Sequence, residues 1–158
     1  MFELLAKIAR CTSGTATIEG IIVLPLAISL MAGGTEFGRI LSAYSTADKS
    51  MRDAARYLAT VPKTGVNGWG LTNAQCLAVY GKLSLTPPPC SSSDPQLIAG
   101  WIDTSTVQCS TCAAVAAGTT EVIHLAADVP YTVLMLSAIG LPNTYTLHVQ
   151  HEERFIGE

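Results

Sequence analysis

Thr15-Ala-Thr-Ile-Glu-Gly-Ile-Ile-Val-Leu-Pro-Leu-Ala-Ile-Ser-Leu-Met-Ala-Gly-Gly-Thr35 is the stretch that decides the architecture of this chain, and Glu19 is its only charged residue. A helix needs about 20 apolar residues to cross the ~30 Å hydrocarbon core of a bilayer, so this stretch predicts one membrane-spanning helix. Lys7 and Arg10 precede it, and basic residues beside a span stay in the cytoplasm. We therefore expect a cytoplasmic N-terminus and an extracytoplasmic chain beyond about Glu36.

The composition of the whole chain fits one folded domain with an apolar appendage. The chain has 158 residues and a net charge of −3, with 49% hydrophobic and 13% charged residues. So many apolar and so few charged residues exclude a disordered chain. The sequence contains no cluster of Lys and Arg, whereas nucleic-acid-binding proteins carry a basic patch. Nucleic acid is therefore not an expected partner.

A signal anchor or a cleaved secretory signal would also have basic residues followed by an apolar run. A cleavage site of small residues is present at Ala32-Gly33-Gly34. A passive signal has no need of Glu19, because a carboxylate at the bilayer centre costs roughly 2.5–3.5 kcal/mol. The alternative for Glu19 is that its side chain only snorkels to the interface.

Motifs on both sides of the span resemble those of a known family. Ser13-Gly14 precedes Thr15-Ala16-Thr17-Ile18-Glu19, and the span is followed by Glu36-Phe37-Gly38-Arg39 and Asp53-Ala54-Ala55-Arg56-Tyr57. This pattern resembles the TadE-like minor pseudopilins of tight-adherence (Flp type IVb) pilus systems. The resemblance covers Cys11 to Ala59, and extends loosely to the C-terminal third through Asp128-Val129-Pro130-Tyr131.

The resemblance implies how the N-terminus is processed. In that family a prepilin peptidase cuts after a glycine, and a glutamate five residues beyond the cut is kept; Gly14 and Glu19 match these positions. Cleavage before Thr15 would place a new ammonium one turn ahead of Glu19. That carboxylate would either gain roughly 0.3–1 kcal/mol near the helix N-terminus or neutralise a neighbouring subunit's ammonium. Major Flp pilins usually carry an aromatic residue after this glutamate, so Gly20 favours a minor component.

The helix is expected to continue beyond the membrane, from Thr15 to Thr60. Pro25 removes a backbone hydrogen bond, and Gly33 and Gly34 weaken the helix. These three residues are candidate bending sites, although Pro and Gly are also common in membrane helices without that role. Beyond the span, apolar residues recur at helical spacing and predict one buried face, made of Phe37, Ile40, Leu41, Tyr44, Met51, Ala55 and Leu58.

The rest of the sequence predicts a short helix capped by Thr72-Asn73 and three strands near 104–109, 121–133 and 144–155. The fold class is therefore α+β and pilin-like, with a long membrane and amphipathic helix packed on a small antiparallel sheet. The expected organisation is a cleaved leader (1–14), a transmembrane part of the helix (15–35), its amphipathic continuation (36–60) and an extracytoplasmic, disulfide-containing globular domain (61–158).

Four of the five cysteines lie after the span, where disulfides persist. Because short loops close most easily, we expect Cys76 to pair with Cys90 and Cys109 with Cys112. Cys109-Ser-Thr-Cys112 also suits a redox pair or half of a zinc site. A redox motif needs a βαβ context and a zinc site a second matching pair, and the sequence offers neither.

No catalytic, metal or cofactor site is expected. His148 and His151 lie an odd number of residues apart and point to opposite faces of one strand, so a three-histidine site with His124 is improbable. No nucleophile spacing or phosphate-binding glycine loop occurs. The chain is therefore predicted not to be an enzyme.

The sequence predicts a minor pseudopilin-like structural subunit that helps to initiate, cap or assemble a Tad-type pilus, anchored in the bacterial inner membrane or present in the extracellular pilus. The resemblance implies four partners besides membrane lipid: a prepilin peptidase, the inner-membrane assembly platform, another minor pseudopilin and the major Flp pilin. The alternative is an anchored binding module, such as an adhesin, that never enters a filament. An enzyme with a thiol site is a third class, which free thiols would reveal.

Overall fold

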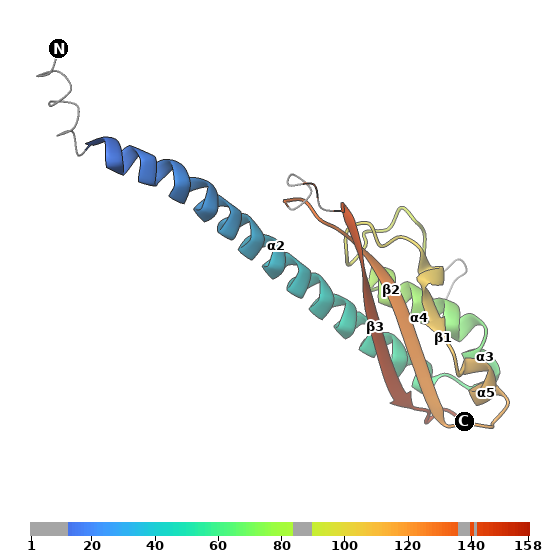
Figure 1. The fold of residues 1–158 in the computed structure, drawn as a ribbon. Helices are drawn as coiled ribbons and strands as arrows, with labels where there is room; N and C mark the ends of the chain where they lie inside the picture. Colours follow the sequence, from blue (N-terminus) through green and yellow to red (C-terminus); the bar gives the residue numbers. More distant parts are fainter. Residues whose placement is uncertain (1–12, 84–89, 136–139, 141) are drawn as a thin grey trace, which may run out of the picture.

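The computed structural model describes residues 13–83, 90–135, 140 and 142–158, with side chains from residue 18 onward (Figure 1). Residues 1–12 of the predicted leader, with Lys7, Arg10 and Cys11, lie outside the described residues. So do residues 136–139 and 141, between the second and third predicted strands.

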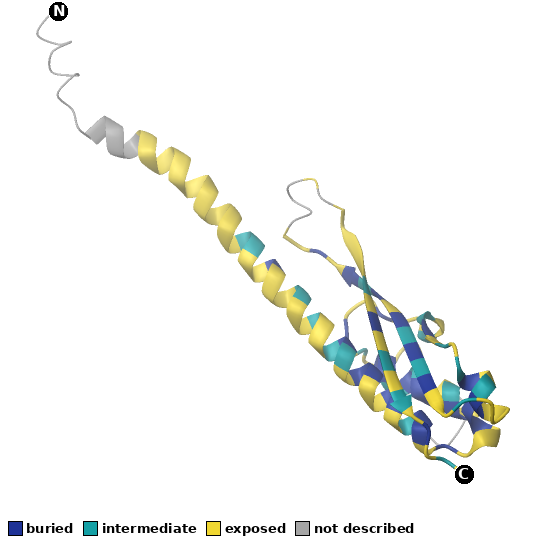
Figure 2. Ribbon diagram, turned by 60° about the horizontal axis from the view of Figure 1, so that its bottom comes forward, coloured by how far each residue is buried: buried dark blue, intermediate teal, exposed yellow. Residues whose placement is uncertain are grey.

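One helix, α2 (Ser13–Thr60), dominates the structure. Its 48 residues correspond to about 72 Å at 1.5 Å per residue. Its first half projects away from the rest of the chain, and Figure 2 shows it as almost entirely exposed. Within the described part of the chain, this is the one helix long and apolar enough to cross a membrane, and none of its apolar window is buried.

The residues that follow α2 form a domain, called here the outer domain. It contains a three-stranded antiparallel sheet in the order β1-β2-β3. Strand β1 (Val107–Cys109) follows a 3-10 turn, η1 (Thr104–Thr106), and pairs with the middle of β2 (Val122–Thr132). Strand β3 (Thr144–Arg154) pairs with β2 along its whole length. The predicted alternation holds for β2, because Ile123, Leu125, Ala127 and Val129 are all buried.

Three short helices complete the domain: α3 (Lys63–Val66), α4 (Trp69–Tyr80) and α5 (Cys112–Ala116). The predicted cap at Thr72-Asn73 is wrong, because α4 already begins at Trp69 after Gly68. Asn73 is buried within α4 and donates to the Tyr57 hydroxyl at 3.3 Å. The helix ends where Gly81 adopts a left-handed conformation (φ 66°), a position that favours glycine.

The core lies where the outer half of α2 packs against β2, β3 and α4. Met51, Ala55 and Leu58 are buried as predicted, whereas Phe37, Leu41 and Tyr44 are exposed. The face of α2 that packs against the domain instead consists largely of small residues, which let the helix approach the sheet closely. Besides Met51 and Leu58, this face comprises Ala43, Ala47, Ser50 and Ala54. The α+β class and the packing of a long N-terminal helix on a small antiparallel sheet are thus confirmed.

Candidate functional site

The expected processing site lies in the first turn of α2. The backbones of Gly14 and Thr15 are helical, because α2 begins at Ser13. Glu19 follows four residues after Thr15, so the two positions share one helix face about 6 Å apart along the axis. The Glu19 side chain is exposed and has no ion-pair partner within the described part of the chain. Its carboxylate is therefore accessible to a partner outside this fold.

The three candidate bending residues lie within a continuous helix. Pro25 is inside α2, and its carbonyl accepts a hydrogen bond from the Ser29 hydroxyl at 2.8 Å. A Cβ atom added to Gly33 or Gly34 would meet nothing within 4 Å. Packing within this chain thus does not require either glycine, and their bending role remains a prediction about assembly.

The four cysteines that follow α2 form the two expected pairs. Cys76 in α4 is joined to Cys90 with a Cα–Cα distance of 5.7 Å. Cys109 at the end of β1 is joined to Cys112 at the start of α5 with a Cα–Cα distance of 5.5 Å. Because both pairs are bonded, neither offers a free thiolate as a metal ligand.

The most distinctive cluster of the structure is centred on Glu36, the first residue after the apolar stretch. Its side chain is completely buried, although it is ionisable. The Tyr131 hydroxyl donates to Oε1 at 2.8 Å, and the backbone N–H groups of Leu134 and Met135 donate to Oε2 at 3.3 and 3.0 Å. Arg39, one turn further along α2, places Nη1 3.6 Å from Oε1. We call these contacts the Glu36 clamp.

The clamp compensates for the burial of a charge. The hydrogen bond from the Met135 N–H is the main reason that the pKa of Glu36 lies below its ordinary value, and the Tyr131 hydroxyl, Arg39 and the Leu134 N–H act in the same direction. Burial alone would raise this pKa, but the donors prevail. Burial and the bond to the carboxylate raise the pKa of Tyr131, which therefore stays a neutral donor. The clamp holds an ionised carboxylate between the helix and the end of β2.

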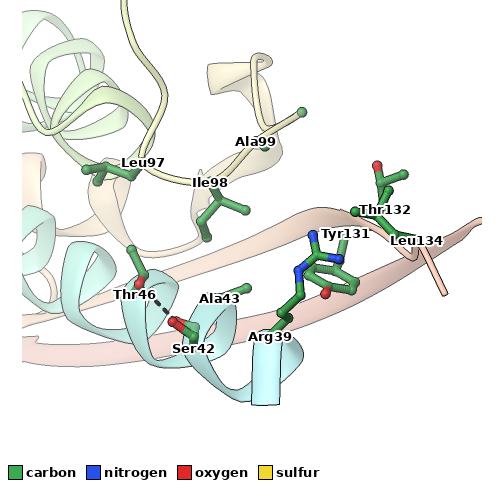
Figure 3. Close-up of a pocket in the computed structure, with 11 residues that line it drawn as sticks. Arg39, Ser42, Ala43, Thr46, Leu97, Ile98, Ala99, Tyr131, Thr132 and Leu134 are labelled. Atoms are coloured by element: carbon green, nitrogen blue, oxygen red, sulfur yellow. Dashed lines mark hydrogen bonds between the residues drawn. The ribbon is translucent and has the colours of Figure 1, made fainter. Parts of the chain in front are cut away.

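A solvent-open cavity of about 530 Å³ lies beside the clamp, between α2, the end of β2 and the segment 97–100 (Figure 3). Arg39, Ser42 and Thr46 line it from α2, and Tyr131 and Thr132 line it from β2. Arg39 is the one charged residue in this lining, and it already contacts Glu36. Among the described residues that line the cavity, no nucleophile is paired with a base.

The three histidines are distributed as predicted along the strands. His148 pairs with Asp128 across β2 and β3. His124 lies 3.7 Å from Glu152, and His151 lies 3.5 Å from Glu153. No group of three metal-ligating side chains occurs among the described residues.

The helix that contains these features matches a known family. The family model described as TadE-like protein matches residues 14–56, from the expected processing glycine to the buried part of α2. Residues 14–56 are TadE-like. Comparison with curated proteins and with solved structures gives no match. The TadE-like segment confirms the resemblance inferred from the motifs, and this family implies involvement in Tad pilus assembly, where such proteins are structural components.

The TadE-like segment contains Glu19 and Glu36 but neither the sheet nor the disulfides. In the sequence, Glu36 and Tyr131 stand out only as parts of two resembling motifs, and no pattern predicts their contact. Ninety-five positions separate the two residues. The one sequence signal for this cluster is that a carboxylate, Glu36, directly follows the apolar stretch. The same pattern also suits a solvated residue at a membrane surface.

Proposed function

We propose that this chain is a minor pseudopilin-like structural subunit for the assembly of a Tad/Flp type IVb pilus, acting in initiation, capping or adhesion. The observation that carries the proposal is the TadE-like match that begins at Gly14. Glu19 follows at the pseudopilin spacing, in a helix whose first half has no partner within the described fold.

The exposed half of α2 supports the membrane part of the proposal. Its large apolar side chains are each more than half exposed, from Ile18 to Met31. Leaving them in water costs roughly 1.5–3 kcal/mol for each side chain that would otherwise be fully buried. Only a bilayer or neighbouring helices can cover such a surface. We infer a single-pass subunit, with its N-terminus in the cytoplasm and its C-terminal domain in the periplasm.

Glu19 is proposed to act only in assembly. In a filament, the carboxylate of one subunit would neutralise the Thr15 ammonium of another in a low-dielectric core, which offsets the cost of burying both charges. The described structure leaves this carboxylate exposed, so the pairing needs no rearrangement of the outer domain.

The proposed partners follow the order of assembly. A prepilin peptidase would remove residues 1–14, and the inner-membrane platform would then extract the mature helix. Another minor pseudopilin and the major Flp pilin would cover its apolar surface. We propose no catalytic activity, since the chain would act through these interfaces.

The test is processing in the native host. Replacing Gly14 with Leu is expected to leave an unprocessed precursor, because a bulky side chain obstructs the peptidase at the scissile bond. Gly38→Leu is the matched control, since a Cβ at Gly38 meets nothing within 4 Å and the residue lies far from the cut. Processing of both variants, or of neither, would refute the proposal. An anchored binding module would be indicated instead if the unmodified chain retains residues 1–14 and the host still makes pili without it.

A further inference from the structure

We propose that the side chains of Leu134 and Met135, which follow β2, insert into the interfacial layer of the bilayer that holds α2, giving the protein a second membrane contact. This inference rests on the membrane anchoring given under the proposed function. The surface comprises the exposed side chains of Leu134 and Met135.

The Glu36 clamp fixes the height of the hairpin end. The N–H groups of Leu134 and Met135 both donate to Glu36 Oε2, and Glu36 directly follows the 15–35 span. The backbone at Leu134 and Met135 therefore lies beside the helix at the point where the apolar span ends. In Figure 2, the hairpin reaches the helix at the boundary between its projecting half and its packed half.

The side chains at this level are apolar and exposed. Leu134 is 59% exposed, Met135 54% and Phe37 61%, which is similar to the apolar residues within the span. A folded domain rarely displays large apolar side chains together unless something covers them. Here the clamp holds two of them next to a membrane-spanning segment.

The change from apolar to polar side chains occurs at one level on both elements. On the helix, Glu36 and Arg39 follow the apolar span. On the hairpin, exposed Thr132 and Thr144 follow Leu134 and Met135 away from the membrane. Tyr145 lies next in line, 42% exposed, and tyrosine is enriched at membrane interfaces. This matched boundary favours lipid as the occupant over a second copy of the chain, whose contacts would not have to follow the end of the span.

The hairpin contact would also restrict the tilt of the domain. One helix alone leaves a single-pass protein able to rotate and tilt about its span, whereas two contacts at one level fix the face that the domain presents. The Glu36 clamp would thus set the orientation of the domain for its assembly partners.

The experiment uses the full-length chain in phosphatidylcholine vesicles. Met135→Trp places a fluorophore at the hairpin end, and Ile156→Trp is the matched control because Ile156 is 70% exposed and follows β3 at the opposite end of the hairpin. The unmodified chain gives the background from Trp69 and Trp101. Far-ultraviolet circular dichroism checks that both variants fold, and vesicle flotation checks that α2 is inserted.

We expect the added emission of Met135→Trp to be blue-shifted and quenched by lipids brominated near the headgroup end of the acyl chain. The emission added by Ile156→Trp should instead be quenched by aqueous iodide and not by brominated lipid. Iodide quenching of Met135→Trp in chains that float would overturn the proposal while leaving the anchoring intact. A blue shift that disappears on dilution with lipid, without quenching by brominated lipid, would also overturn it and indicate a second copy. Chains that do not float would refute the anchoring and this inference together, whereas N-terminal mass spectrometry tests pseudopilin processing separately.

Discussion

Replacing Tyr131 with Phe tests whether the Glu36 clamp holds the end of β2 against α2. The substitution removes one hydroxyl that donates to a fully buried carboxylate at 2.8 Å and keeps the ring in place. Hydrogen bonds to charged groups contribute roughly 1.5–3 kcal/mol. The free energy of unfolding should fall by about that amount at pH 7. For a domain of about 100 residues, each kcal/mol lowers Tm by roughly 4–8 °C.

The pH dependence of this loss distinguishes a charged acceptor from a neutral one. The pKa of Glu36 in the folded chain lies below its ordinary value of 4.5. Its stabilising contribution is therefore complete above about pH 4.5 and is lost as the pH falls through the folded-state pKa. Removing the Tyr131 donor raises that folded-state pKa. The difference in stability between the unmodified chain and Tyr131→Phe should consequently shrink in acid.

Tyr80→Phe is the matched control. The Tyr80 hydroxyl donates at 2.8 Å to the neutral carbonyl of Ile102, from a ring that is also buried. Its removal should cost roughly 0.5–1.5 kcal/mol, with no change across this pH range. Thermal unfolding of the full chain in detergent, followed by near-ultraviolet circular dichroism from pH 7 down to the pH at which the unmodified chain unfolds, measures both. A loss for Tyr131→Phe that stays constant over this whole range would refute the charged clamp.

The remaining predictions concern the disulfides and the projecting helix. Replacing Cys76 and Cys90 together by Ser should lower the free energy of unfolding by about 3 kcal/mol, the chain-entropy value for a 15-residue loop. The same change at the Cys109–Cys112 pair should cost about 1.9 kcal/mol for its four-residue loop, and thermal unfolding compares the two variants. Non-reducing peptide mapping that found Cys76 joined to Cys109 would contradict the pairing. Alanine at Gly33 and Gly34 should leave folding and insertion unchanged, since the added Cβ atoms meet nothing within 4 Å. The substitutions should favour the helical conformation by about 0.8–1 kcal/mol per residue, which makes the helix harder to bend. Electron microscopy should therefore show fewer pili, and normal numbers would exclude a bending role. The Glu19→Leu variant should insert into the membrane at least as well as the unmodified chain, because a charge is removed from the apolar stretch. The same variant should not assemble pili. Full piliation would mean that the Glu19 side chain only snorkels.

Periodicity and chain connectivity made much of this fold predictable. The alternation from Ile123 to Val129 placed β2 and its buried face correctly, because a strand has one core face and a period of two. The end of α2 at Thr60 followed from helical spacing up to Leu58. The two cysteine pairs followed from loop length. Each of these features is encoded locally.

The features that sequence analysis missed depend on contacts between distant segments. The apolar character of Phe37, Leu41 and Tyr44 predicts that they lie on the buried face. The sheet instead packs about 100° around the helix, on Ala43 and Ala47. The Glu36 to Tyr131 bond joins residues 95 positions apart. A carboxylate next to a span also has a solvated alternative, and only the folded arrangement decides between the two.

Mass spectrometry of the N-terminus of the protein made in its own host decides whether the chain is processed as a pseudopilin. If the chain is a pseudopilin-like subunit, the mature protein begins at Thr15, and Glu19 is its fifth residue. A mature chain that begins after Gly34 would identify a secretory signal, and a chain that retains Met1 would identify a simple anchor; either result would contradict the account.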